Sequence, residues 1–205
     1  RLAQQLYEGV DLGEEGPVAL ITYMRTDSVR MSKEAVDAIR GHISGNFGKD
    51  YMSPKPRVYR SKGAAQEAHE AVRPTYVERT PESVMPFLSG DLYKLYNLVW
   101  RRAVASQMAP ALFRVTNAQV AAGDYTFIAK GRVVVFEGHT VLAGTSPGED
   151  ELLPELKEGM ELELLELSSE QKFTQPPARF TEAALVRTLE REGIGRPSTY
   201  ANIIS

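Results

Sequence analysis

The chain has 205 residues, of which 42% are hydrophobic and 25% charged, and its formal net charge at pH 7 is −3. This length allows one large domain or two small ones, and the composition is typical of a soluble globular protein. Apolar runs fall short of the roughly 20 residues that cross a bilayer, the first residues lack a signal-peptide pattern, and the absence of cysteine excludes disulfides and thiolate metal sites, so a cytoplasmic protein is predicted.

The charge is unevenly distributed along the chain. Residues 1–110 carry +2, residues 111–170 carry −7 and residues 171–205 carry +2. Nucleic acids are bound by local clusters of basic side chains rather than by whole-chain charge. The middle segment is therefore a poor candidate for contact with a nucleic acid, and the two flanks remain candidates.

Residues 1–110 are predicted to be mostly helical. Ser32 is a good N-cap for a helix over residues 33–46, because its hydroxyl can accept from a free backbone N–H. Thr80 followed by Pro81 repeats this start signal. The clearest apolar stripe at helical spacing runs over residues 91–108 and consists of Leu92, Leu95, Tyr96, Val99 and Ala103.

The pattern changes to the period of strands after Pro110. Runs of β-branched and aromatic residues cover 112–122, 125–131 and 132–138, with breaks predicted at Gly123–Asp124 and Gly131. Residues 143–158 are acidic, contain glycine and proline, and are predicted to form a loop. Residues 159–167 alternate apolar and acidic side chains, which predicts a strand with one wet face. Thr181 is then expected to cap a helix that Gly193 ends.

This order of elements predicts an α+β chain in three parts. Residues 1–110 form a helical domain, residues 111–170 a small antiparallel β domain, and residues 171–205 the start of a further helical domain. Both ends of the sequence lie inside helical patterns, whereas domain boundaries usually lie in polar linkers. We therefore expect the chain to be a piece of a longer protein.

Tyr23 is the first candidate for chemistry. A single tyrosine is more often structural, because a phenol with a pKa of about 10 needs a cation or a base beside it to act as a nucleophile. Arg25 shares the face of Tyr23 if the segment is extended, and its guanidinium could stabilise a phenolate and bind a phosphate. Asp27 could orient that arginine or a histidine.

A second cluster lies in residues 64–75, AAQEAHEAVRPT. In a helix, Gln66, His69 and Arg73 would share one face, and these side chains suit recognition of a phosphodiester. The ordinary alternative is a surface histidine on a solvated helix with Glu67 and Glu70. A zinc site is not indicated, because the HExxH pattern is absent.

A third cluster lies in residues 174–201. Arg196, Ser198 and Thr199 stand at the start of the last predicted helix, where free backbone N–H groups and small hydroxyls form a natural phosphate site. Phe180 or Tyr200 could stack on an unpaired base. Simple capping and packing are the ordinary alternatives.

Three segments together resemble the type IA DNA topoisomerases. Residues 21–28 (ITYMRTDS) resemble their active-site signature, residues 65–75 (AQEAHEAVRPT) their histidine motif, and residues 176–201 their third shared block. All three occur in the family's order over nearly the whole chain. The methionine at position 24, within this signature, is similar to the bacterial topoisomerase I branch of the family.

The resemblance implies a function and a set of site residues. Tyr23 would attack single-stranded or underwound DNA and form a 5′-phosphotyrosyl bond, and strand passage and religation would relax negative supercoils without ATP. Arg25 would stabilise charge and His69 would contact the scissile phosphate. The remaining implied DNA-binding residues are Asp27, Arg73, Arg196, Ser198 and Thr199. The helical part would carry the tyrosine, and the β part would act as a hinge or arch in the bacterial cytoplasm, at the nucleoid.

The family also binds Mg²⁺ in a separate N-terminal Toprim domain. No acidic DxD-type cluster occurs in this sequence, since Asp11, Glu14 and Glu15 lie in a polar loop that matches no metal motif. We therefore expect Mg²⁺ in the longer protein, no metal site in this chain, and neither relaxation nor efficient cleavage by the chain alone.

Two other functions are compatible with the residues. A non-catalytic module for single-stranded DNA would use Tyr23 and Phe180 as stacking platforms and leave no covalent adduct. A recombinase or type IB enzyme would also use a tyrosine, with catalytic basic residues in another arrangement and a bond to the opposite end of the break.

Overall fold

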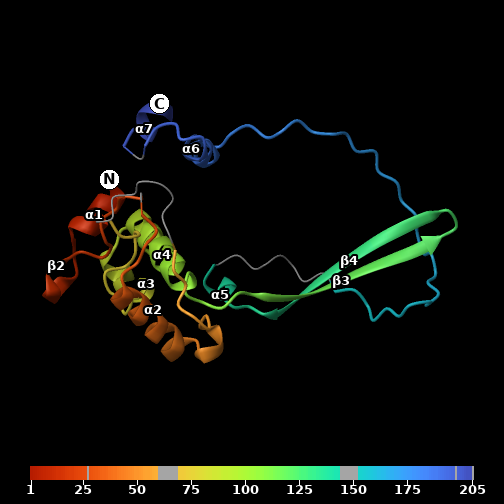
Figure 1. Cartoon of the computed structure of the whole chain (residues 1–205), viewed down its shortest axis with the longest axis horizontal. Coiled ribbons are helices and arrows are strands. Elements are labelled where there is room, and N and C mark those ends of the chain that lie inside the picture. Colours follow the sequence, from red (N-terminus) through yellow and green to blue (C-terminus); the bar gives the residue numbers. More distant parts are fainter. Residues whose placement is uncertain (27, 60–68, 144–151, 197, 205) are drawn as a thin grey trace. The chain divides into compact units, whose positions relative to one another are not determined.

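The computed structural model describes residues 1–26, 28–59, 69–143, 152–196 and 198–204 (Figure 1). Its helices are α1 (Leu2–Glu8), α2 (Lys33–Asn46), α3 (Pro81–Val84), α4 (Gly90–Ala105), α5 (Thr140–Ala143), α6 (Glu182–Arg191) and α7 (Tyr200–Ile204), with 3-10 turns at Gly13–Glu15, Lys49–Tyr51 and Met85–Phe87. The strands are β1 (Val10–Asp11), β2 (Pro17–Val18), β3 (Leu112–Ala122) and β4 (Tyr125–Phe136). Two compact units result, residues 1–154 and 155–205.

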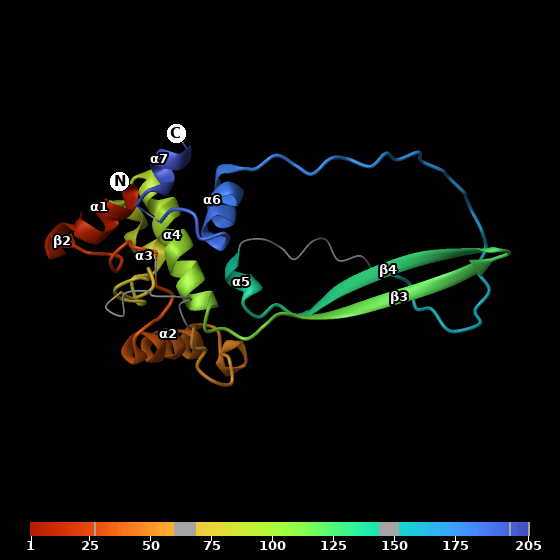
Figure 2. The ribbon, with the colours of Figure 1, turned by 45° about the horizontal axis from the view of Figure 1, so that its top comes forward.

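The predicted helices of the first unit form where their apolar stripes and caps placed them. The Ser32 hydroxyl accepts from the backbone N–H of Ala35 at 3.2 Å and starts α2, and Thr80 starts α3 in the same way. α2 and α4 pack against each other in the helical body (Figure 2). The buried side chains include Leu6, Leu20, Ile21, Ile39, Ile43, Tyr96, Trp100, Val104 and Met108.

Helix α4 also holds the loop that follows residue 75. The Trp100 indole N–H donates to the carbonyl of Val77 at 2.9 Å, and the Tyr96 hydroxyl donates to the carbonyl of Arg79. Both rings are buried, and burial raises the pKa of the Tyr96 hydroxyl well above its ordinary value. These two bonds attach residues 77–79 to the core at successive turns of one helix.

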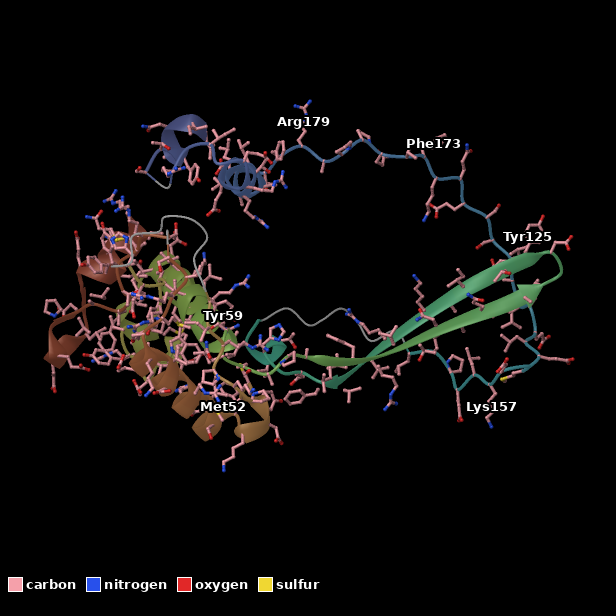
Figure 3. The ribbon with its side chains drawn as sticks, viewed as in Figure 1. Met52, Tyr59, Tyr125, Lys157, Phe173 and Arg179 are labelled. Atoms are coloured by element: carbon pink, nitrogen blue, oxygen red, sulfur yellow. The ribbon has the colours of Figure 1, made fainter. Side chains whose placement is uncertain are left out.

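β3 and β4 form a long antiparallel hairpin, with Tyr125 at its tip (Figure 3). Ala122 pairs with Tyr125, so Gly123 and Asp124 make a two-residue turn, and Gly123 has the positive φ (59°) that such turns need. The break predicted at Gly131 is wrong, because Gly131 pairs with Thr116 inside a continuous β4. A glycine retains the backbone N–H and C=O on which the ladder depends.

The second unit is mostly irregular before α6. The strand predicted over residues 159–167 is wrong, since these described residues form no strand and Leu164, Leu165 and Leu167 are exposed. Alternation alone does not make a strand, which also needs a partner for its backbone groups. The Thr181 cap is confirmed, and α6 ends as predicted at Gly193 (φ 73°), where the N–H groups of Gly193 and Ile194 return to the carbonyls of Glu190 and Leu189.

Part of the predicted loop over residues 143–158 lies outside the described residues. The division at residues 110 and 170 into three domains stays a prediction. In the described ranges, no helix is both long enough and apolar enough to cross a membrane.

Candidate active site

Tyr23 follows a segment that is fixed by backbone hydrogen bonds. The N–H of Leu20 donates to the carbonyl of Leu6 at 2.8 Å, and both Leu20 and Ile21 are fully buried. The N–H of Ile21 donates to the same carbonyl at 3.4 Å, and the N–H of Thr22 donates to the carbonyl of Arg73 at 2.9 Å. The chain therefore reaches Tyr23 directly from the core.

The histidine motif runs beside this segment in an extended conformation. Ile21 and Pro74 form an antiparallel bridge, and the N–H of Thr75 donates to the carbonyl of Leu20 at 3.0 Å. The N–H of Ala71 donates to the carbonyl of Arg30 at 2.7 Å. Residues 20–22 and 71–75 thus lie together although they are far apart in the sequence.

The helix considered for residues 64–75 is wrong over its described part, residues 69–75. The N–H groups of alternate residues bond to other segments instead of to carbonyls one turn earlier, which is the period of extended backbone. Pro74 also disfavours helical geometry at Arg73. Gln66 and Glu67 lie outside the described residues, and His69 and Arg73 do not share a helical face in the described segment.

Tyr23 and His69 are brought together by this pairing of segments. Their ring centroids are 5.6 Å apart with an interplanar angle of 46°. The Tyr23 side chain is 43% exposed, and His69 is partly buried. Because the Tyr23 phenol is exposed, a large substrate can reach it, whereas a tyrosine in the core would be out of reach.

Tyr7 of α1 also packs against the candidate nucleophile. Its ring meets that of Tyr23 edge-to-face, with centroids 5.3 Å apart. The sequence analysis did not single out Tyr7, because its position in a short helix gives no signal of a distant partner. Tyr23 thus contacts both a second phenol ring and an imidazole.

Arg73 bonds within the protein. Its Nη2 and Nε donate to Oε2 of Glu70 at 2.7 and 3.1 Å, and its Nη1 donates to the carbonyl of Pro74 at 3.0 Å. The two side chains of this ion pair are only 15% and 26% exposed. Direct contact between Arg73 and DNA stays a prediction.

Arg25 is exposed in the irregular segment after Tyr23, and its predicted role in charge stabilisation stays a prediction. Asp27 lies outside the described residues.

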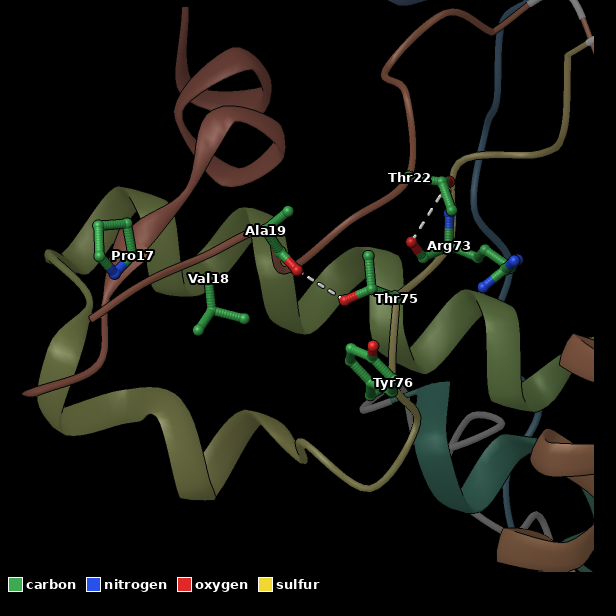
Figure 4. A pocket seen from close by; sticks show the side chains of 7 residues that line it. All are labelled: Pro17, Val18, Ala19, Thr22, Arg73, Thr75 and Tyr76. Carbon is green, nitrogen blue, oxygen red and sulfur yellow. Dashed lines mark hydrogen bonds between the residues drawn. The ribbon is translucent and has the colours of Figure 1, made fainter. Parts of the chain in front are cut away.

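An open depression of about 460 Å³ lies beside Thr22. Its lining consists of Pro17, Val18, Ala19, Thr22, Arg73, Thr75 and Tyr76 (Figure 4). Two contacts join these residues: the Thr75 hydroxyl donates to the carbonyl of Ala19 at 2.7 Å, and the Thr22 hydroxyl oxygen lies 3.4 Å from the carbonyl of Arg73. Tyr23 and His69 are not among the lining residues, so the depression adjoins their pair without enclosing it.

The third cluster belongs to the second unit. The Thr199 hydroxyl accepts from the N–H of Arg196 at 2.8 Å and contacts its carbonyl at 3.0 Å, which closes the turn before α7. Arg196, Ser198 and Thr199 are all exposed. Their contact with a DNA strand stays a prediction.

Among the residues that the structure describes, no three His, Asp or Glu side chains gather in a way that could hold a metal ion. Binding of Mg²⁺ by a domain outside this chain stays a prediction.

An exposed tyrosine beside a histidine, on a mixed α and β scaffold, is the arrangement expected from the three motifs. All of residues 1–205 match the family model described as DNA topoisomerase, and the chain belongs to this family. The predicted resemblance to bacterial type IA enzymes and the α+β fold class are both confirmed.

The relatives agree with this membership over the full chain. DNA topoisomerase 1 of Xylella fastidiosa is 51% identical over 216 residues, which is 100% of this chain and 26% of that protein. DNA topoisomerase 1 of Pseudomonas aeruginosa is 50% identical, over 100% of this chain and 23% of its own length. The solved full-length topoisomerase I of Thermotoga maritima matches 99% of this chain and 32% of that chain, with 37% identity and a TM-score of 0.80. The chain thus spans about a quarter of the length of these curated relatives.

Proposed function

We propose that this chain carries the nucleophile of a DNA topoisomerase that cleaves and religates single-stranded or underwound DNA. The observation that carries the proposal is the exposed Tyr23 ring 5.6 Å from the His69 ring in a chain of the DNA topoisomerase family. The longer protein would work in the bacterial cytoplasm, at the nucleoid.

In the proposed reaction, the Tyr23 hydroxyl oxygen attacks a backbone phosphorus atom and loses its proton. The bond from phosphorus to the 3′ oxygen breaks, and the leaving oxygen takes up a proton to become a 3′-hydroxyl. The 5′-phosphate remains on Tyr23. This phosphodiester keeps the energy of the broken bond, so the 3′-hydroxyl can reverse the attack after strand passage without ATP.

The neighbouring residues would assist in three ways. His69 contacts the scissile phosphate, and the Arg25 guanidinium stabilises charge on the phenolic oxygen and the phosphate. Asp27 and Arg73 support these groups. Arg196, Ser198 and Thr199 hold the strand upstream of the break.

We propose that Mg²⁺ binds to the longer protein, in a domain outside this chain. The described residues offer no donor set for it, so we assign no step in this chain to the metal. The family resemblance leads us to expect that the 205-residue chain alone neither relaxes plasmid DNA nor cleaves it efficiently, and that adding an N-terminal Toprim domain restores cleavage. Relaxation by the purified chain with Mg²⁺ would contradict this expectation.

The decisive experiment traps the covalent intermediate on the longer protein. A single-stranded oligonucleotide labelled on either side of the break is incubated with Mg²⁺, and the reaction is stopped with detergent. We expect an adduct through the 5′-phosphate that the Tyr23→Phe variant fails to form, because that variant lacks the attacking oxygen. Tyr125→Phe is the matched control, since Tyr125 is a 74% exposed tyrosine on the hairpin.

The same experiment separates the alternatives. A non-catalytic DNA-binding module would bind the oligonucleotide with strong salt dependence and give no adduct. A recombinase or type IB enzyme would be linked to the 3′ end. An adduct that survives in Tyr23→Phe would identify another residue as the nucleophile.

A further inference from the structure

We propose that Glu70 is a positioning residue that, through Arg73, holds His69 beside Tyr23. This inference rests on the proposed function of Tyr23. The sequence alone is compatible with a solvated helix face for Glu70, whereas its carboxylate bonds to the start of α2 and to Arg73, whose backbone in turn bonds to Thr22.

The first oxygen of the carboxylate attaches the histidine segment to the start of α2. Glu70 Oε1 accepts from the backbone N–H of Ser32 at 2.7 Å. Ser32 is the N-cap of α2 and is therefore fixed itself. This bond joins the residue after His69 to the end of the segment that begins at Tyr23.

The second oxygen binds the Arg73 side chain. Glu70 Oε2 accepts from Nη2 at 2.7 Å and from Nε at 3.1 Å. Hydrogen bonds between ionised partners are stronger than neutral ones and more specific in geometry. Residues 70 and 73 are thereby joined through their side chains.

The backbone of Arg73 completes the connection to Tyr23. Its N–H donates to the Thr22 hydroxyl oxygen at 3.0 Å, and its carbonyl accepts from the N–H of Thr22 at 2.9 Å. The Thr22 hydroxyl also donates to the carbonyl of Ala71 at 2.9 Å. Glu70 is adjacent to His69 and Thr22 is adjacent to Tyr23, so the network fixes the residues next to both members of the pair.

An ordinary surface ion pair would not have this role, because exposed pairs contribute little to a structure. The chain contains such a pair for comparison. Arg79 binds Glu15 through both oxygens at 2.7 and 3.2 Å, and those side chains are 25% and 57% exposed. The Glu70–Arg73 pair is less exposed and touches both segments of the site, whereas Glu15 lies in the turn between β1 and β2.

Catalytic groups depend strongly on such positioning. A misplacement of about 1 Å at a reacting group can lower a rate by roughly 10²-fold. We therefore expect Glu70→Gln, in which the amide can still accept from Ser32 but no longer pairs with Arg73, to slow cleavage by about 10- to 100-fold. Glu70→Ala, which removes both interactions, should slow it further.

The test uses the longer protein with its metal domain. Single-turnover cleavage of a single-stranded oligonucleotide is measured with saturating enzyme and Mg²⁺, and the Kd for the same oligonucleotide is measured in EDTA. Melting temperatures are recorded for every variant. Glu15→Gln is the matched control and should retain the wild-type rate, Kd and melting temperature.

A positioning role predicts a specific pattern. Glu70→Gln should cleave slowly with an unchanged Kd and the melting temperature of the control. In a His69→Ala background, the same substitution should have a much smaller effect than in the wild type, because the part of its effect that acts through His69 is already lost. This lack of additivity is a result that a merely structural residue would not give.

Other outcomes overturn the inference. Equal cleavage rates for Glu70→Gln and Glu15→Gln exclude the positioning role. A weaker Kd with an unchanged rate for bound DNA assigns the pair to DNA binding, and a lower melting temperature or full additivity with His69→Ala assigns it to folding. If the wild-type protein forms no adduct at Tyr23, the proposed function itself has failed, which is a separate result.

Discussion

Removal of a single oxygen atom, in Tyr96→Phe, should change both the stability of the first unit and its response to alkaline pH. The Tyr96 side chain is fully buried, and its hydroxyl donates to the carbonyl of Arg79. The phenylalanine ring fills the same space, so only this hydrogen bond is lost. We expect a loss of about 1–2 kcal/mol in the free energy of unfolding at pH 7.

The sign of the effect should change at high pH. Burial raises the pKa of the Tyr96 hydroxyl above its ordinary value of 10, and the nearby Arg79 lowers it by less. Above pH 10 the unfolded chain therefore loses this proton before the folded chain does, and the wild type loses up to about 1.4 kcal/mol per pH unit from this group. The phenylalanine variant has no such group, so its disadvantage should disappear by roughly one pH unit above 10.

Trp100 provides the assay, because it is the only tryptophan in the sequence and is 4% exposed in the same core. Urea unfolding is followed by its fluorescence at pH 7 and at several values above pH 10. Tyr125→Phe, at a 74% exposed tyrosine, is the control and should match the wild type at every pH. A constant difference between Tyr96→Phe and wild type across this range would refute the argument from burial.

Two further substitutions test other parts of the first unit. Burial lowers the pKa of His42 below its usual 6.5, against the opposing charge of Glu78, so the unfolded chain binds this proton more readily and stability falls as the pH drops below about 6.5. His42→Gln should flatten the pH dependence of the urea midpoint between pH 7 and pH 5, and an unchanged slope would exclude His42 as its source. Gly138 has a φ of 51°, and a Cβ there would lie 2.5 Å from the backbone of Pro110, so Gly138→Ala should lower the free energy of unfolding by about 3 kcal/mol in urea titrations. Gly123→Ala has a similar φ (59°) but open space and should cost only about 1 kcal/mol, so equal losses would contradict the steric argument.

Local signals in the sequence predicted the elements that depend on nearby residues. The Ser32 and Thr181 caps, the apolar stripe of α4 and the turn at Gly123 are all present. The strand predicted over residues 159–167 is wrong, and the helix considered for residues 64–75 does not form over its described part, because backbone conformation there depends on whether a distant segment offers hydrogen-bond partners. Residues 159–167 have none among the described strands, and residues 71–75 bond to residues 20–22 and 30 instead of forming a helix.

The same division applies to the candidate site. The sequence by itself determined family membership, and it predicted Tyr23, Arg25 and His69 as site residues from the order of residues in three motifs. Only the tertiary structure decided that His69 and Tyr7 both contact Tyr23 and that Glu70 and Arg73 join the two segments. Such contacts arise from hydrogen bonds and packing between distant parts of the chain, and local patterns in the sequence do not predict which parts will meet.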